Sequence, residues 1–334
     1  MVSELGKLFP SIPLVAEEDS SFIRSNNLED SVVNAVTDKA SVEDKYWTHD
    51  DVLKAIDRGG KGAFVFGTKP ATYWVLDPID GTRGFLKGND ALYVVGLALV
   101  VEGDVVLGVM GCPNWHYGFS SESTTEVQKN REDLSASGII MVAHIGCGTW
   151  TKRLPNMLDS WTRCFVDDCC LVHMARFCIP ESQTWESLPL SATFTATANA
   201  NTIKDNQILL FPACCGSLCK YLMVASGRTS VFVLRAKMQK TIKAWDHAVG
   251  MICVHEAGGK VSNLSLSPSW YSLVFVMFIS VSYFILNSCI NYHSILTLSN
   301  LEHLGLRFKG STQFARSNET QHQFRKKFMT SAST

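Results

Sequence analysis

The sequence lacks several features that would assign it to a common functional class. It carries 30 Lys and Arg against 31 Asp and Glu, a net charge of −1, so no excess of positive charge favours nucleic acid or an anionic membrane as a partner. The order Gly-x-x-x-x-Gly-Lys-Ser/Thr is missing, which excludes a P-loop. The first residues show no basic segment followed by an apolar core, so we expect no signal peptide.

Cysteine pairs at metal-binding or redox spacing are also missing. The 11 Cys are an odd number, no two stand as Cys-x-x-Cys, and the neighbours Cys169-Cys170 and Cys214-Cys215 could hardly bridge to each other. This usage predicts reduced thiols in a reducing compartment, cytoplasmic or organellar. The spacing Cys215-x-x-x-Cys219 does not suit zinc.

Charge is absent over one long window, Val261 to Leu301. Within it, the apolar, aromatic and Ser run 270–286 is at the lower edge of the roughly 17–25 residues that span a bilayer. A transmembrane tail is therefore one hypothesis, and a divergent tail that belongs to no membrane is the other. Residues 302–334 are polar and basic, which predicts a disordered end.

The most informative stretch that is present is Asp77-Pro78-Ile79-Asp80-Gly81-Thr82. The apolar run 73–76 before it predicts a buried strand, and Pro78 should end that strand because proline cannot donate to a sheet. Gly81 permits a sharp turn, and Thr82 is a suitable N-cap for a following helix. Two carboxylates at a strand end suit a hard cation, and a helix start suits a phosphate.

A lone Asp-x-x-Asp is more often an ordinary turn than a metal site. Here, however, the whole order of strand, Asp, Pro, apolar residue, Asp, Gly and Thr resembles the metal motif of the magnesium-dependent, lithium-sensitive phosphatases of the inositol monophosphatase superfamily. The continuation, residues 83–88 (Arg-Gly-Phe-Leu-Lys-Gly), is similar to the 3'(2'),5'-bisphosphate nucleotidases of the yeast and plant salt-tolerance type.

Two further stretches resemble the same family. Glu17-Glu18 follows a short apolar run, as in the strand that delivers a Glu pair to the metal site. Residues 243–250 with 256–259 are similar to the motif Trp-Asp-x-Ala-x-Gly followed by Glu-Ala-Gly-Gly. The apolar spacing there predicts a helix with one apolar face, with Asp246 in its first turn. An acid in a first turn is common for dipole reasons alone.

A third stretch, Ser217 to Tyr221, resembles the nucleotidases' Asp-Ser-x-x-Lys-Tyr, although Gly216 stands where Asp is usual. By this resemblance, Ser217 and Lys220 lie near the nucleotide. The strand 231–235 follows, and its Arg235 is then a phosphate or base contact. Without the resemblance, Lys220 and Arg235 read equally well as solvated charges at element ends.

The resemblance implies an α/β fold, a layered sandwich like that of the sugar phosphatases, incomplete at both ends. We expect an N-terminal metal- and phosphate-binding half at 1–142, a C-terminal half at 143–262, and a divergent apolar, then basic, tail at 263–334. The family carries two helices and an Asp-Tyr motif before the Glu pair, and this chain has only sixteen residues there. The absent segment would leave sheet surface uncovered and remove one catalytic carboxylate.

The resemblance also implies the ligands of the metal ions. Asp77 bridges two ions, Glu17 and the Ile79 carbonyl complete one site, and Asp80 and Asp246 complete the other. Oxygen ligands alone indicate Mg²⁺, with Mn²⁺ as a substitute, rather than zinc. The catalytic residues implied are Thr82, whose hydroxyl orients the attacking water, Asp80, and Glu18, which supports the site.

The implied activity is hydrolysis of 3'-phosphoadenosine 5'-phosphate, or its 2' isomer, to AMP and phosphate, without a protein nucleophile. The partner is thus a small nucleotide bisphosphate, with no nucleic acid, and we expect a monomer. Two alternatives stay open, an inactive protein that binds metal or nucleotide and an inositol polyphosphate 1-phosphatase. The substrate contacts implied are Gly81, Thr82, Ser217, Lys220, Tyr221, Arg235 and Asp246.

Overall fold

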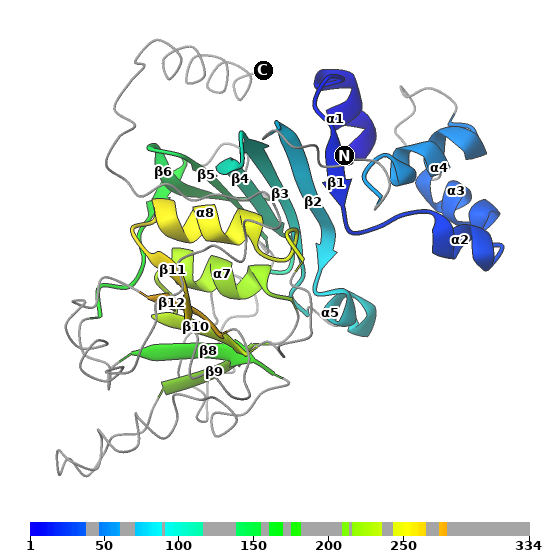
Figure 1. The fold of residues 1–334 in the computed structure, drawn as a ribbon. Coiled ribbons are helices and arrows are strands. Elements are labelled where there is room, and N and C mark those ends of the chain that lie inside the picture. Colours follow the sequence, from blue (N-terminus) through cyan, green and yellow to red (C-terminus); the bar gives the residue numbers. More distant parts are fainter. Residues whose placement is uncertain are drawn as a thin grey trace, which may run out of the picture.

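The computed structural model describes residues 1–37, 47–60, 71–88, 91–115, 138–154, 160–169, 175–181, 209–213, 216–235, 243–264 and 274–278 (Figure 1). The N-terminal elements are α1 (Val2–Leu8), β1 (Leu14–Ala16), α2 (Ser21–Ser25), α3 (Glu29–Thr37), α4 (His49–Asp57), β2 (Tyr73–Asp80), α5 (Thr82–Lys87), β3 (Val94–Val101), β4 (Asp104–Cys112), β5 (Ile139–His144), β6 (Gly148–Arg153) and β7 (Thr162–Cys164). The remaining ones are β8 (Arg176–Pro180), β9 (Leu209–Ala213), α7 (Leu218–Ala225), β10 (Val231–Arg235), α8 (Ala248–Glu256), β11 (Lys260–Leu264) and β12 (Val274–Phe278).

A seven-stranded sheet has the order β1 to β7, in which each strand lies beside its neighbour in sequence. Strands β2 to β7 are antiparallel, and β1 joins the edge in parallel to β2 with Leu14 opposite Trp74. The turn between β3 and β4 has positive φ at Glu102 and Gly103, at 53° and 90°. Two successive positive φ values match the twist of a tight hairpin.

The sequence predicted that strand β2 would end at Pro78, but the strand continues beyond this residue. It runs from Tyr73 to Asp80, and its pairing with β3 shifts register between Asp77 and Asp80. A register shift of this kind accommodates a residue that cannot donate to the ladder. The irregularity therefore lies between the two carboxylates that the sequence singled out.

A second sheet of five strands has the order β11-β12-β10-β8-β9. Its strand β12 contradicts the transmembrane hypothesis for 270–286, because residues 274–278 pair with both β10 and β11. The other residues of that run, and 302–334, lie outside the described part of the chain. Among the described residues, no helix has the length and apolarity needed to cross a membrane.

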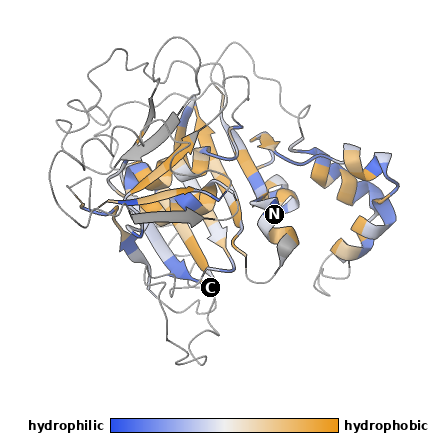
Figure 2. Ribbon diagram, turned by 90° about the horizontal axis from the view of Figure 1, so that it is seen from below, coloured by the Kyte–Doolittle hydropathy of each residue, from blue (hydrophilic) through white to orange (hydrophobic). Residues whose placement is uncertain are grey.

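Helices α7 and α8 lie between the two sheets (Figure 1). In α8, every residue from Ala248 to Val254 is buried, so the prediction of a single apolar face was wrong. A Cβ added at Gly250 would lie 2.2 Å from Cγ of Tyr221, which shows how closely the two helices approach. The hydropathy colouring shows the same central concentration of apolar residues, whereas the helices at the N-terminal side are mixed (Figure 2).

The boundary expected at residue 142 falls inside a sheet. Strand β5 spans it and pairs with both β4 and β6. Likewise, β12 belongs to the second sheet although it lies in the segment expected as a tail. The division of the chain into halves stays a prediction. The first sheet is formed by β1 to β7, and the second sheet begins with β8.

Glu256, at the end of α8, fastens this helix to the seven-stranded sheet. Its carboxylate oxygens accept the backbone N–H groups of Gly146, in the turn after β5, at 3.0 Å and of Gly148, the first residue of β6, at 2.9 Å. Burial would raise the pKa of Glu256, but the bonds from His255 and these two N–H groups hold it below its ordinary value. The ionised carboxylate therefore stabilises the fold.

We expect Glu256→Gln to lower the free energy of unfolding by about 1.5–3 kcal/mol near neutral pH, because hydrogen bonds to a charged acceptor are lost. A depressed pKa in the folded state means that this contribution is present above the unfolded value and is lost as pH falls through the folded one. Urea unfolding of both proteins at about pH 7 and about pH 3.5 measures this. Glu4→Gln, in an exposed pair with Lys7, is the control and should change little. An equal deficit at both pH values would contradict the prediction.

Candidate metal centre

Three carboxylates from distant parts of the chain meet at the end of β2. One oxygen from each of Glu17, Asp77 and Asp246 lies within 4.8 Å of the others. Glu17 follows β1, Asp77 lies in β2, and Asp246 lies in the turn before α8 rather than in its first turn. The parallel pairing of β1 with β2 brings Glu17 beside Asp77, and the packing of α8 on the sheet brings Asp246.

Asp77 is the most buried of the three, with 1% of its surface exposed. Burial raises the pKa of Asp77, and the charges of Asp80, Glu17 and Asp246 raise it further. One oxygen, Oδ1, accepts the backbone N–H of Ile79 at 3.0 Å. The other, Oδ2, is buried and has no hydrogen-bond partner among the described residues.

These carboxylates fit a divalent metal ion. An unpartnered buried carboxylate oxygen beside two further carboxylates is costly unless positive charge offsets it. A donor set of oxygen atoms alone suits a hard cation rather than zinc. The described part of the chain thus contains an acidic cluster that could bind a metal ion.

Asp80 lies near these three carboxylates. Its side chain contacts the start of α7, a contact that the sequence did not predict. Its oxygens accept the backbone N–H groups of Ser217 at 3.1 Å and Leu218 at 2.6 Å, at the start of α7. Burial raises the pKa of Asp80 to about 6, against these two bonds and the charge of Lys220. A carboxylate has about four acceptor positions, so the predicted ligand role of Asp80 stays a prediction.

The turn after β2 differs from the prediction in its cap. Gly81, with φ of 91°, is the N-cap of α5, and Thr82 is its first residue. The Thr82 hydroxyl donates to the Ile79 carbonyl at 3.1 Å, the carbonyl that was predicted as a metal ligand. Thr82 is exposed to solvent, where a hydroxyl is accessible to water and substrate.

The predicted substrate contacts lie in varied surroundings. Ser217 is the N-cap of α7, but its side chain makes no cap bond. Lys220 is buried, its ammonium donates to the Gly216 carbonyl, and its Nζ lies 6.0 Å from the ring centre of Phe232. The side chain of Arg235 lies outside the described atoms, although its backbone ends β10.

Tyr221 and His247 form a buried pair that links α7 to the segment of Asp246. The Tyr221 hydroxyl and Nδ1 of His247 are 3.0 Å apart. Burial lowers the pKa of His247 to about 4 and raises that of Tyr221. His247 is thus a neutral core residue, and Tyr221 has no exposed surface with which to contact a substrate directly.

Gly216 shows why the Asp usual at this position in the resembled family does not fit here. Its φ is 71°, and an added Cβ would lie 2.1 Å from Oδ2 of Asp80. The sequence showed that Gly stands at position 216 where Asp is usual, but it could not show the contact with Asp80. The two positions are 136 residues apart, and only the fold brings them together.

The chain is similar to proteins of known families. The family model described as the inositol monophosphatase family matches residues 1–280, which includes part of the segment 263–334 that was expected as a divergent tail. A protein of Arabidopsis thaliana with the provisional name of mitochondrial 3'(2'),5'-bisphosphate nucleotidase is 65% identical over 264 residues, which cover 78% of this chain and 63% of that protein.

More distant relatives carry similar names. The 3'(2'),5'-bisphosphate nucleotidase of Schizosaccharomyces pombe is 31% identical over 278 residues, 80% of this chain and 71% of that protein. The 3',5'-bisphosphate nucleotidase 2 of Arabidopsis thaliana is 33% identical over 262 residues, 75% and 67% of the two chains. The chain thus spans less than two thirds of the length of the mitochondrial relative.

We expect Gly216→Ala to lower the free energy of unfolding by about 3 kcal/mol or more, because it adds a collision with Asp80 to the strain of a positive φ. The control is Gly258→Ala, where φ is 92° and no atom lies within 4 Å of the added Cβ. Backbone strain alone should cost about 1–2 kcal/mol there. Urea unfolding of both variants measures the difference, and equal costs would show that Asp80 and α7 are not in this contact.

Proposed function

The chain belongs to the inositol monophosphatase family, and we propose that it is a Mg²⁺-dependent phosphatase that converts 3'-phosphoadenosine 5'-phosphate, or its 2' isomer, to AMP and phosphate. The observation that carries the proposal is the buried, unpartnered oxygen of Asp77 between Glu17 and Asp246. The names of the relatives support the choice of substrate. Since those names describe other and longer proteins, activity and substrate are both part of the proposal.

Each proposed residue has a task that its surroundings allow. Glu17, Asp77 and Asp246 would hold the cation, with Asp80 and the Ile79 carbonyl as further ligands. A bound divalent cation supplies the positive charge that activates water and stabilises the leaving oxygen in phosphate ester hydrolysis. The exposed hydroxyl of Thr82 would orient the water, the N–H groups of Gly81 and Thr82 would bind the phosphate, and Glu18 would support the site.

The reaction needs no protein nucleophile, and the buried thiols agree with this. Cys112 is fully buried, and burial raises its pKa. Burial likewise raises the pKa of Cys219 to about 11. A protonated thiol without access to solvent does not attack a phosphate.

Ser217, Lys220, Tyr221 and Arg235 complete the proposed nucleotide side of the site. The charge of the buried Lys220 ammonium acts on Asp80 and lowers its pKa, and Tyr221 would act through His247 beside Asp246. All the proposed ligands come from one chain, so a monomer would suffice. We place the protein in the mitochondrion, following the name of the relative at 65% identity.

We expect purified chain to release phosphate from 3'-phosphoadenosine 5'-phosphate with Mg²⁺, and to do so faster than from inositol 1,4-bisphosphate. Asp77→Asn should slow the reaction about 10³-fold, since a ligand that contributes several kcal/mol to charge stabilisation is lost. Asp80→Asn is a poorer test, because an amide in its place would also disturb the start of α7.

The control is Asp30→Asn. Asp30 is an exposed residue that pairs with His49 and has no part in the proposed site. The variant should release phosphate at the rate of the unchanged chain. A chain that unfolds cooperatively but hydrolyses neither substrate would refute the enzyme and leave a metal-binding protein.

A further inference from the structure

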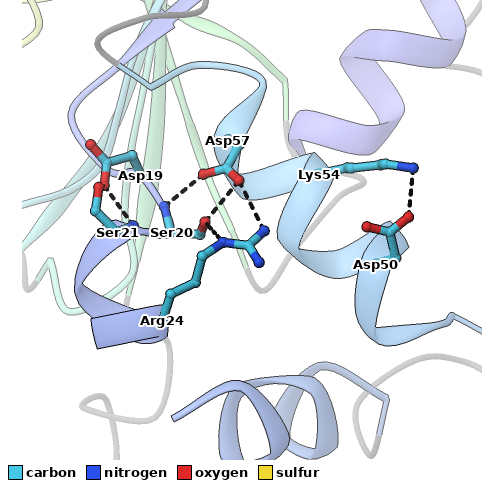
Figure 3. A network of polar contacts seen from close by, with 7 residues as sticks. All are labelled: Asp19, Ser20, Ser21, Arg24, Asp50, Lys54 and Asp57. Carbon is cyan, nitrogen blue, oxygen red and sulfur yellow. Dashed lines mark hydrogen bonds and ion pairs between the residues drawn. The ribbon is translucent and has the colours of Figure 1, made fainter. Parts of the chain in front are cut away.

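The loop that carries Glu17 is fastened at both ends. It leaves β1 where the N–H of Ala16 donates to the Gly59 carbonyl at 2.5 Å and that of Glu17 to the Leu76 carbonyl at 3.2 Å. It enters α2 at Ser20, whose backbone N–H and hydroxyl donate to Oδ1 and Oδ2 of Asp57 at 2.8 and 2.7 Å (Figure 3). Between Glu17 and Ser20 lie only Glu18 and Asp19.

Two of these anchoring residues, Asp57 and Gly59, lie at the end of α4. A Cβ on Gly59 would lie 2.5 Å from Cβ of Ala16, and one on Gly60 would lie 2.8 Å from Cβ of Asp19. No side chain fits between the end of α4 and the loop. The end of α4 and the two glycines after it therefore contact the loop at Ala16, Asp19 and Ser20 rather than at one point.

Ser20 stands directly before α2, where a serine normally caps its own helix. Its hydroxyl makes no such bond, and Oδ1 of Asp19 accepts the N–H of Ser21 at 2.8 Å instead. Ser20 is 2% exposed, and its hydroxyl is directed to Asp57. The serine is thus used for the tertiary contact with α4.

The loop needs this support because its charges repel each other. Glu17, Glu18 and Asp19 are three successive acidic residues, so like charges lie side by side in this loop. Glu17 in addition faces Asp77 and Asp246, and like charges at this distance repel one another. Arg24 adds the positive charge, with Nε 2.8 Å from the Ser20 hydroxyl and Nη2 3.4 Å from Oδ2 of Asp57 (Figure 3).

We propose that Asp57 is a positioning residue for the metal centre, which holds Glu17 at the cation through Ser20 although it does not touch the cation itself. The inference rests on the proposed function in one respect, namely that Glu17 is a metal ligand. It adds a residue from α4, an element that contributes no ligand. Residues that orient metal ligands typically contribute 10–100-fold in metal affinity.

The test is direct binding of Mn²⁺, measured by the electron paramagnetic resonance signal of the free ion, for the full chain and three variants. Asp57→Asn should raise the dissociation constant by about tenfold or more. Asp50→Asn is the matched control, because Asp50 lies on the same helix and pairs only locally with Lys54 at 2.5 Å (Figure 3). It should bind Mn²⁺ like the unchanged chain, and Asp77→Asn gives the background of weak sites.

A purely structural role for Asp57 predicts a different result. It would lower the melting temperature without metal but leave the dissociation constant of the folded protein as it was, and that outcome would overturn the inference. A positioning role predicts that excess Mg²⁺ restores phosphate release by Asp57→Asn to the original maximal rate. If the unchanged chain itself binds no Mn²⁺ above the Asp77→Asn background, the metal centre and the inference are both refuted.

Should Asp57→Asn fail to fold, Ser20→Ala answers the same question. It removes the hydroxyl bond to Asp57 and keeps the backbone bond, so a smaller rise in the dissociation constant is expected. Ser20→Thr retains the hydroxyl and should restore the affinity. Equal Mn²⁺ affinity of Ser20→Ala and the unchanged chain would overturn the inference.

Discussion

The structure depends on keeping mutually repelling carboxylates together at the end of one strand. Asp77 is buried there, with Asp80, Glu17 and Asp246 close enough for their charges to raise its pKa. Such an arrangement costs free energy in the metal-free chain, because each carboxylate disfavours the ionisation of the others. The surrounding helices and strands therefore hold each acidic residue in place through contacts with it or with residues near it in the chain.

Each acid is held in a different way. Asp80 is held by two N–H groups at the start of α7 and by the charge of Lys220. Glu17 is held through the loop that α4 fastens, and Asp246 precedes a helix packed between two sheets. These supports come from parts of the chain that share no local sequence, so the centre is a property of the assembled fold.

Part of this centre could be predicted from the sequence, because some of its features are determined by residues close together in the chain. A strand followed by Asp77-Pro78-Ile79-Asp80-Gly81-Thr82 restricts the backbone within a few residues, and so the strand, the turn and the placement of Asp77 could be predicted. The errors were also local. Proline was accommodated by a register shift in β2, and Gly81 took the cap position because its positive φ was needed there.

What could not be predicted depends on distance in sequence. The bond from Ser20 to Asp57, the cap of α7 by Asp80, and the pair of Tyr221 with His247 all join residues with no pattern in common. The apolar run 270–286 was ambiguous for another reason. A short apolar segment suits a membrane and a buried strand equally, and pairing with β10 and β11 decides for the strand over residues 274–278.

The hydrogen bond between Asp80 and the N–H of Leu218 joins residues that are 138 positions apart in sequence, and this has a consequence for folding during synthesis. At about 5–20 residues per second, a ribosome adds the second partner roughly 7 to 28 s after the first. The hairpins of β2 to β4 are complete in sequence long before that and can form early, since their contacts are local. Until Leu218 has been added, Asp80 lacks the N–H partners that it has in the folded chain. The step that buries Asp80 against the start of α7 is therefore also the step that joins this helix to the end of β2.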